Sequence, residues 1–279
     1  MKAIGIFVNP LINKFNEIFE MLQKLNTQGI SFYFLNEEIN YPDFIKKHSN
    51  EKLSVILVFG GDGTILRAVP ISLKLNVPIL GINFGRLGFL TESNFKDLNT
   101  VFSDILNERY KIQKRMLLVV SVNRKKETVF KELGLNDAVV IRGNVPKLIN
   151  IKFKNNKRFV LETRCDGVIA STPTGSTAYS LSAGGPILTP TMEAIVFTPI
   201  NPHILSVRPM VFKSSDKLHF IVEGSEDRPI LQIDGKNNFE LESNDEVLIT
   251  ASKHKVSFIK LTNKTFYQIL RRKMHMGKI

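Results

Sequence analysis

The first hundred residues alternate short apolar runs with segments in which apolar residues recur every three or four positions. The apolar runs, which are long enough for buried strands, lie at residues 4–8, 31–35, 55–59 and 79–83. The amphipathic segments predict a helix with an apolar face of Leu11, Phe15, Ile18, Phe19, Leu22 and Leu25. Further helices are expected from about Ile65 to Leu75 and after Asn94, a residue type that caps helices. This alternation predicts a parallel, doubly wound, Rossmann-like sheet.

After about residue 110 the pattern changes to short strands separated by turn signals such as Asn155-Asn156 and Asp234-Gly235. The strands are predicted at 117–122, 148–153, 159–162, 218–222, 230–233, 247–250 and 256–259. A helical pattern is scarce there, apart from a short one after Gly175. The sequence therefore predicts an α/β domain at 1–112, a β-rich domain at 113–260, and a C-terminal segment at 261–279. In that last segment, residues 265–270 are expected to form a helix or strand that packs back on the first domain.

The composition is that of an ordinary globular protein, with 43% hydrophobic and 23% charged residues. No apolar run approaches the about 20 residues that a membrane span requires, and the apolar stretch after Met1 is too short for a signal peptide. The single cysteine, Cys165, excludes an internal disulfide and suits a reducing compartment. We therefore expect a cytoplasmic protein with no membrane partner.

Basic residues outnumber acidic ones by 38 to 26, which gives a net charge of +12. The lysines are scattered, and the tight clusters are Arg124-Lys125-Lys126, interpreted as a hairpin tip, and Arg271-Arg272-Lys273, interpreted as a solvated tail. Neither zinc-finger spacing nor an aromatic RNA-binding motif accompanies them, so nucleic acid is not expected as a partner. Small polyanionic ligands fit the charge excess better.

The segment Gly60-Gly61-Asp62-Gly63-Thr64 follows the apolar run Val55–Phe59 and precedes a predicted helix. Such a junction directs backbone N–H groups and the positive end of a helix at a ligand beyond the strand, most often a phosphate. The Asp62 carboxylate would repel a phosphate, so its presence here suggests that a metal ion or a proton transfer requires it. The segment therefore indicates phosphoryl transfer. The alternative is a tight turn in which Asp62 caps the helix.

Two further segments are weak signals alone. The stretch Asn83–Thr91 places glycines after a strand, and Asn136-Asp137 pairs an amide with a carboxylate, but either could be a simple loop or turn. The run Asp166–Pro186 is stronger, because it predicts a strand, a loop rich in Ser, Thr and Gly, and a short helix. Gly175 permits a close backbone approach there, and Tyr179 offers a ring on which a base could stack. The alternative is a capping turn with a core tyrosine.

Together these segments resemble the NAD kinases. The pentapeptide 60–64, the element Leu87-Gly88-Phe89-Leu90, the pair Asn136-Asp137 and the run 166–185 occur in the order and spacing of a bacterial NAD kinase, over roughly residues 55–260. The pentapeptide alone is shared with diacylglycerol-type lipid kinases and, more loosely, with phosphofructokinases. The segment Thr174–Ser180 is what makes the resemblance specific.

The resemblance implies transfer of the terminal phosphate of ATP, or of polyphosphate in some members, to the 2′-hydroxyl of the adenosine ribose of NAD. Asp62 would accept the proton of that hydroxyl, and Mg²⁺ would be carried with the nucleotide, without a dedicated protein metal site. The resemblance also implies NADP biosynthesis and a homodimer or homotetramer. A lipid kinase and a non-catalytic dinucleotide-binding module remain as alternatives.

The resemblance also assigns roles to individual residues. Gly60, Gly61, Gly63 and Thr64 would form the phosphate loop. Asp62 and the backbone of Gly63 would contact NAD, Arg67 would meet phosphate, and Phe89 would line the pocket. Asn136 and Asp137 would hold ribose hydroxyls, and Thr177, Ala178 and Tyr179 would enclose the base. Arg164 and Asp166 would touch NAD, in some members across a subunit boundary. The remaining NAD-binding positions are Lys147, Thr174, Ser180, Leu181, Ser182 and Lys236.

Overall fold

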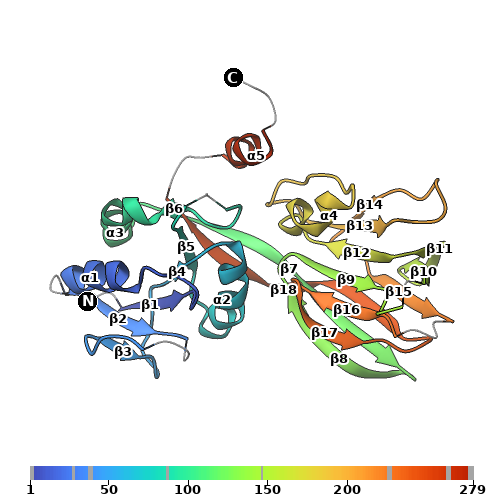
Figure 1. The fold of residues 1–279 in the computed structure, drawn as a ribbon, viewed down its shortest axis with the longest axis horizontal. Helices are drawn as coiled ribbons and strands as arrows, with labels where there is room; N and C mark the ends of the chain where they lie inside the picture. Colours follow the sequence, from blue (N-terminus) through green and yellow to red (C-terminus); the bar gives the residue numbers. More distant parts are fainter. Residues whose placement is uncertain are drawn as a thin grey trace. The chain divides into compact units, whose positions relative to one another are not determined.

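The computed structural model describes residues 3–26, 29–36, 40–85, 88–145, 147–224, 228–261 and 265–275 of the chain. The chain folds as two compact units (Figure 1). Unit 1 consists of residues 1–114 and 256–279, and unit 2 consists of residues 115–255. Within the described ranges, no helix combines the length and the apolar character needed to cross a membrane.

Unit 1 is built on a parallel sheet. Its strands follow the order β3 (Ile45–Lys47), β2 (Ser31–Phe34), β1 (Ala3–Val8), β4 (Val55–Phe59) and β5 (Ile79–Asn83). The end of β18 (Glu246–Lys260) and the short β6 (Ser93–Asn94) also pair with β5 in parallel. Every residue of β4 and β5 is buried, as expected for strands covered on both faces. The predicted parallel sheet is confirmed, and β4 and β5 have the predicted bounds.

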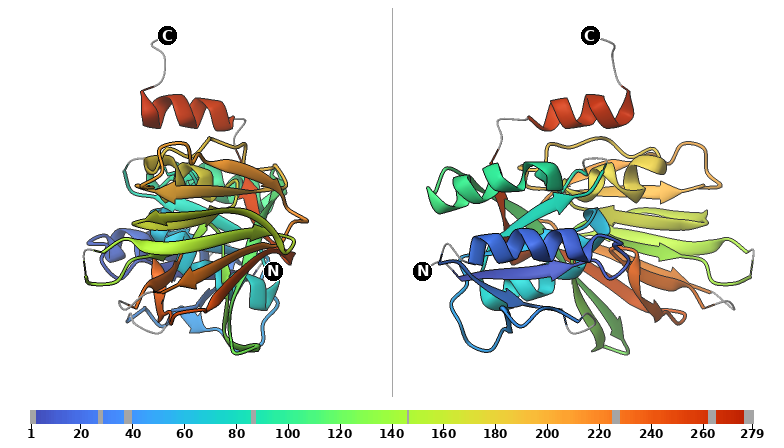
Figure 2. Two further views of the ribbon diagram at one scale, coloured as in Figure 1. Left: turned by 90° about the vertical axis from the view of Figure 1, so that its right-hand side faces the viewer. Right: turned by 60° about the vertical axis from the view of Figure 1, so that its left-hand side comes forward.

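Helices cover both faces of this sheet. Helices α1 (Phe15–Asn26) and α3 (Leu98–Leu106) pack in one core with the side chains of Ile4, Ile6 and Val8. In the right-hand view of Figure 2, the blue helix α1 lies in front of the blue strand β1. Helix α2 (Asp62–Leu75) lies on the other face, where its Arg67 guanidinium is 5.8 Å from the centre of the Phe7 ring. Side chains of successive β1 residues point to opposite faces of the sheet, where they meet α1 and α3 on one face and α2 on the other. This arrangement confirms the doubly wound fold.

Helix starts and ends differ from the predicted bounds in several places. Leu11 lies before α1 and is exposed, so it does not belong to the helical face. Asn94 is a cap as predicted, since its side chain accepts a hydrogen bond from the Lys96 N–H, but a 3₁₀ turn at Phe95–Asp97 precedes α3. The C-terminal segment is a helix, α5 (Phe266–Met274), that begins at a capping box formed by Thr265 and Gln268.

Unit 2 is β-rich, as predicted. One antiparallel sheet has the order β14 (Met210–Lys213), β13 (Ala194–Ile200), β12 (Gly167–Ser171), β9 (Asp137–Ile141), β16 (Ile230–Ile233) and β17 (Lys236–Glu240). A second antiparallel set comprises β11 (Arg158–Cys165), β10 (Ile149–Asn155), β15 (Leu218–Glu223) and the first part of β18. Strands β7 (Lys111–Arg124) and β8 (Glu127–Gly134) form a hairpin. Short helical turns, η2 (Gly175–Thr177) and α4 (Tyr179–Ser182), follow β12.

The hairpin tips of unit 2 agree with the turn signals. Lys125 and Lys126 have φ values of 51° and 72°, so the cluster 124–126 is a hairpin tip as predicted. Asp234 and Gly235 likewise have positive φ values, 52° and 69°, which is the geometry of a tight two-residue hairpin turn. In contrast, the strands predicted at 247–250 and 256–259 are one continuous strand, β18. The polar residues between them remain extended and do not turn.

Candidate active site

Asp62 is the first residue of α2 and directly follows the sheet strand β4 and its Gly60-Gly61 link. The helix therefore begins earlier than predicted, and Asp62 and Gly63 belong to its first turn. The N-cap position is Gly61, and no side chain caps this helix end. The Asp62 carboxylate instead accepts hydrogen bonds from the backbone N–H groups of Phe89, at 2.9 Å, and Leu90, at 3.0 Å. The alternative of Asp62 as a capping residue is therefore wrong.

Gly88 makes this arrangement possible. A Cβ atom at position 88 would collide with Asp62 Oδ1 and lie only 2.6 Å from Asp62 Cγ. The loop is held in place because Gly88 N–H donates to the Thr91 hydroxyl at 2.6 Å. The segment 88–90 thus forms a cradle for the Asp62 carboxylate. Leu87, the first residue of the predicted element, lies outside the described residues.

The phosphate-loop glycines have two different physical roles. Gly60 packs so closely on Thr64 that a Cβ atom there would lie 2.6 Å from the Thr64 Cβ. In contrast, apart from the adjoining residues and the nearby helix backbone, no atom of the described chain lies within 4 Å of a Cβ built on Gly61 or Gly63, and neither residue has a positive φ. The chain's own packing does not explain these two glycines. Open space beside N–H groups at a helix start suits an anionic ligand that approaches the backbone.

Helix α5 brings a basic residue to Asp62. The ammonium of Lys273 lies 3.7 Å from Asp62 Oδ2 and 4.6 Å from the centre of the Phe89 ring. The Phe266 ring of the same helix lies 6.4 Å from the Phe89 ring. The interpretation of residues 271–273 as a solvated tail is therefore wrong for Lys273. The capping-box pattern of Thr265 and Gln268 was the signal that a helix begins there.

In unit 2, the pair Asn136-Asp137 lies at the start of β9 and is organised by Asp234. The N–H groups of Leu135, Asn136 and Asp137 donate to the Asp234 carboxylate at 2.8, 2.6 and 3.2 Å. Asp234 belongs to the β16–β17 turn. Sequence reasoning selected Lys236 in this segment and missed the role of Asp234, although the Asp-Gly turn itself was visible. Lys236 is exposed at the start of β17.

Asp137 is only 4% exposed, and its environment changes its acidity. Burial, and to a lesser extent the charge of Asp234, raises the pKa of the Asp137 carboxyl to about 7. Burial raises the pKa of Asp234 as well, but the N–H groups of residues 135–137 and the charge of Lys236 oppose this rise. The charge of Asp234 thus favours the protonated form of Asp137. A carboxyl that titrates near neutral pH can donate a hydrogen bond to a ligand hydroxyl or accept one from it.

The loop after β12 packs on the same residues. The Thr172 hydroxyl donates to the Leu135 carbonyl at 2.6 Å, and the Thr172 N–H donates to the Asn136 carbonyl at 2.8 Å. A Cβ atom on Gly175 would collide with the Asn136 carbonyl and lie 2.7 Å from Asn136 Cα. The close approach that Gly175 permits is thus to Asn136. The structure brings the Asn136-Asp137 pair and the Ser/Thr-rich loop together.

The side chains of this loop differ in what they offer to a ligand. Tyr179 is 40% exposed, so the alternative of a core tyrosine is wrong. Thr174 Oγ1 is buried and has no hydrogen-bond partner within the described parts of the chain. Ser182 is exposed, whereas Thr177, Ala178 and Leu181 are half-buried. Ser180 is fully buried and its hydroxyl bonds to Thr198 at 2.8 Å, so this side chain supports the turn and is not presented to a ligand.

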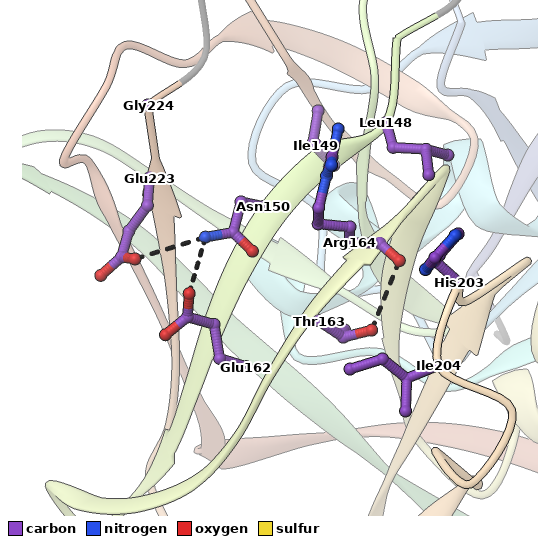
Figure 3. Close-up of a pocket in the computed structure, with 10 residues that line it drawn as sticks. All are labelled: Leu148, Ile149, Asn150, Glu162, Thr163, Arg164, His203, Ile204, Glu223 and Gly224. Carbon is purple, nitrogen blue, oxygen red and sulfur yellow. Dashed lines mark hydrogen bonds between the residues drawn. The ribbon is translucent and has the colours of Figure 1, made fainter.

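The remaining predicted residues lie toward β10 and β11. Asp166 accepts a hydrogen bond from Arg142 Nε at 3.0 Å and another from the Asn201 amide at 2.9 Å. Lys147 is exposed in the loop before β10. Arg164 lines a cavity of about 600 Å³, together with Asn150, Glu162, Thr163, His203 and Glu223 among others (Figure 3). Hydrogen bonds from the Asn150 amide to Glu162 and Glu223 fix one wall of this cavity.

Comparisons with known proteins find a matching domain family for each part of the chain. The ATP-NAD kinase N-terminal domain family matches residues 16–110, and the ATP-NAD kinase C-terminal domain family matches residues 135–261. The NAD kinase of Aquifex aeolicus is 36% identical over 99% of this chain and 100% of its own length. The NAD kinase of Desulforamulus reducens is 41% identical over 98% of this chain and 97% of its own length.

Two solved structures share the fold over the whole chain. Yeast NADH kinase complexed with NADH has a TM-score of 0.87 and 25% identity, and the match covers 100% of this chain and 89% of the yeast chain. An NAD kinase from Archaeoglobus fulgidus in complex with ATP has a TM-score of 0.74 and 25% identity, and the match covers 100% of both chains. These matches leave the lipid kinase alternative without support. The chain belongs to the NAD kinase family.

Proposed function

We propose that this chain transfers the terminal phosphate of ATP to the 2′-hydroxyl of the adenosine ribose of NAD, giving NADP, with Asp62 as the proton acceptor. The observation that carries the proposal is the placement of the Asp62 carboxylate. Two backbone N–H groups fix it at the first turn of α2, beside the open space at Gly61 and Gly63. In phosphoryl transfer to a hydroxyl, a carboxylate held beside the bound phosphate can accept the proton of that hydroxyl.

The fixed carboxylate is suited to accept a proton. An ionised carboxylate has about four lone-pair sites, of which the Phe89 and Leu90 N–H groups use two, so acceptor capacity remains for a substrate hydroxyl. A ribose hydroxyl is a poor nucleophile until its proton is removed, and a positioned base typically accelerates such a step by about 10²–10⁴-fold. The N–H bonds also fix the direction of the carboxylate before the substrate arrives.

Most of the remaining acceleration is expected from neutralisation of the phosphate charge. The N–H groups of Asp62 and Gly63 stand at a helix start, where they have no intrahelical acceptor. Bound Mg²⁺ would add positive charge at the transferred phosphoryl group. Across the described ranges there is no cluster of three His, Cys, Asp or Glu side chains that could hold a metal ion. In this proposal Mg²⁺ is carried with the nucleotide, on phosphate oxygens and water.

Unit 2 would supply the groups that hold the dinucleotide. Asn136 and Asp137 would bind ribose hydroxyls, with Asp234 fixing the backbone of both. The exposed ring of Tyr179 would stack on a base. The other proposed contacts are Arg67 and Phe89 in unit 1 and Lys147, Arg164, Asp166, Thr174, Thr177, Ala178, Leu181, Ser182 and Lys236 in unit 2. Because the Ser180 side chain is buried, a contact there would be through the backbone.

The cellular setting is also part of the proposal. We infer a cytoplasmic enzyme of NADP biosynthesis, and the free thiol of Cys165 suits a reducing compartment. A homodimer or homotetramer is inferred from the resemblance, in which Arg164 and Asp166 act across a subunit boundary. Arg164 is exposed on unit 2 and accessible for such a role.

The test uses the purified protein with ATP, Mg²⁺ and NAD, and measures NADP with an NADP-specific dehydrogenase. Asp62→Asn is expected to lower kcat by about 10²-fold or more, because the amide cannot accept the proton. NAD affinity measured by calorimetry should change by no more than about twofold, because the asparagine can still hydrogen-bond the 2′-hydroxyl and the other proposed contacts are unchanged. Circular dichroism controls for folding. Normal turnover in this variant would remove Asp62 from its role, and failure of the wild-type protein to form NADP would refute the function.

A further inference from the structure

Helix α5 lies outside both matched family ranges, which end at residues 110 and 261. It is nevertheless a well-defined element of unit 1. The reciprocal hydrogen bonds of its capping box fix its start, and Ile269 and Leu270 are buried. Its Phe266 contacts Phe89, whose backbone N–H holds the Asp62 carboxylate. The helix is thus docked on the loop that positions the proposed proton acceptor.

The last turn of α5 presents Lys273 to this loop. Its ammonium lies against both the face of the Phe89 ring and the Asp62 carboxylate. The side chains of Lys273 and Asp62 are 31% and 32% exposed, so about two-thirds of each is covered. Arg271 and Arg272 on the same turn are exposed, and so is Lys273 when the whole residue is considered. The position of the charge, and not simply the basic character of the turn, distinguishes Lys273.

We propose that Lys273 is a positioning residue for phosphoryl transfer, which acts by holding the Asp62 carboxylate in place and offsetting its charge. This inference rests on the proposed role of Asp62. An anionic carboxylate next to the phosphates of ATP is repelled by them, and a nearby ammonium reduces that repulsion. Because Lys273 acts through Asp62, its loss should lower kcat and leave NAD affinity unchanged.

The chain allows a selective test through chemical modification. The protein has one cysteine, Cys165, which is fully buried, and burial raises the pKa of its thiol to about 12. This thiol is therefore inert toward alkylation. In Lys273→Cys, the new thiol can be alkylated with 2-bromoethylamine, which restores an ammonium at nearly the original distance from the backbone. Methyl methanethiosulfonate gives a neutral adduct at the same position.

Lys273→Cys is expected to lower kcat by about three- to tenfold, in line with the modest strength of partly exposed ion pairs and cation–π contacts. Aminoethylation should restore kcat to within about twofold of the wild-type value, whereas the neutral adduct should not. NAD affinity should stay the same in all three forms. Wild-type protein treated with each reagent controls for modification of Cys165, and Arg271→Cys, treated identically, controls for a charge on the same turn.

Three results would overturn the proposal: an unchanged kcat in Lys273→Cys, an increased kcat, or equal recovery with the neutral adduct. The last would mean that α5 acts through packing alone. If the wild-type protein forms no NADP, the proposed function itself fails. If the wild-type protein is active and Lys273→Cys is equally active, only the role of Lys273 fails.

Discussion

The carboxyl group of Asp137 is buried in the folded chain and hydrated in the unfolded chain, and this difference makes stability depend on pH. In the folded chain, the pKa of Asp137 is raised to about 7 by burial and by the charge of Asp234. The folded chain therefore retains a proton on this group between about pH 4 and pH 7, where the unfolded chain has released it. The contribution of Asp137 to stability is fully present below about pH 4 and is lost as the pH rises through about 7.

Asp137→Asn should therefore stabilise the protein at alkaline pH. The melting temperature at pH 8 is expected to rise by at least about 2 °C, since about 1 kcal/mol corresponds to about 2–4 °C in a domain of this size. At pH 4 the variant and the wild-type protein should melt at nearly the same temperature. Thermal unfolding of the ligand-free protein measures both values, with Asp43→Asn as a control at an exposed aspartate. A lower melting temperature of the variant at pH 8 would contradict the conclusion that ionised, buried Asp137 destabilises the folded chain.

Single residues differ in how well the sequence identifies them. Asp62 and Tyr179 could be selected because each lies in a dense local pattern of glycines or hydroxyl residues after an apolar strand. Asp234 could not, because the N–H groups that it binds are 97 to 99 residues away in the chain. Lys273 was hidden for the same reason, since its contacts are with Asp62 and Phe89. Chain-distant contacts leave no local trace in the sequence.

Among the elements, buried strands were the easiest to predict. Strands β4 and β5 match their predicted bounds because all their residues are buried and all but Asn83 are apolar or glycine. Strand β18 was divided in two because its middle, residues 251–255, is polar and largely exposed. The sequence predicts a start of α2 at about Ile65 because glycines at 60–63 favour a loop, whereas the helix begins at Asp62 and includes Gly63.

The first turn of α2 yields a prediction in which stability and activity change in opposite directions. Gly63→Ala adds a methyl group that meets no atom within 4 Å beyond the adjoining residues and the nearby helix backbone. The free energy of unfolding should rise by about 0.5–1 kcal/mol, because alanine favours helix more than glycine. kcat/KM should fall at least about tenfold, because the methyl group would fill the space proposed for the bound anion. Denaturant titration and steady-state kinetics measure the two effects.

A matched control lies on the same helix. Pro70 is exposed in the interior of α2, so Pro70→Ala should also stabilise the helix, by restoring a backbone N–H. It adds no atom at the first turn, and its activity should stay within about twofold of the wild-type value. If Gly63→Ala kept full activity, the open space at Gly63 would not hold a ligand.

For the whole molecule, the change of pattern near residue 110 predicted two kinds of fold, and both are present. The pairing of strands distant in sequence was not predictable. Phe258 pairs with Ile79, and Leu218 pairs with Ile249, and neither register has a local signal. Apolar periodicity predicts which residues are buried, but it does not specify which strand lies beside which.

Net charge bears on the proposed assembly. Each copy of the chain carries +12, so association of copies must overcome mutual repulsion. Salt screens this repulsion, with a Debye length of about 10 Å at 0.1 M ionic strength. Sedimentation velocity is therefore expected to show a homodimer or homotetramer whose fraction increases from low to moderate salt. An active monomer under all these conditions would contradict the assembly and the role of Arg164 and Asp166 across a boundary.

The division of unit 1 into residues 1–114 and 256–279 has a consequence for the order in which the ribosome makes the chain. Asp62 is made first, all of unit 2 follows, and only then is Lys273 made. A nascent chain therefore carries the Asp62 carboxylate without its ammonium partner while unit 2 is being made. With the proposed role of Lys273, full turnover is reached only once both segments of unit 1, separated by all of unit 2, have been made.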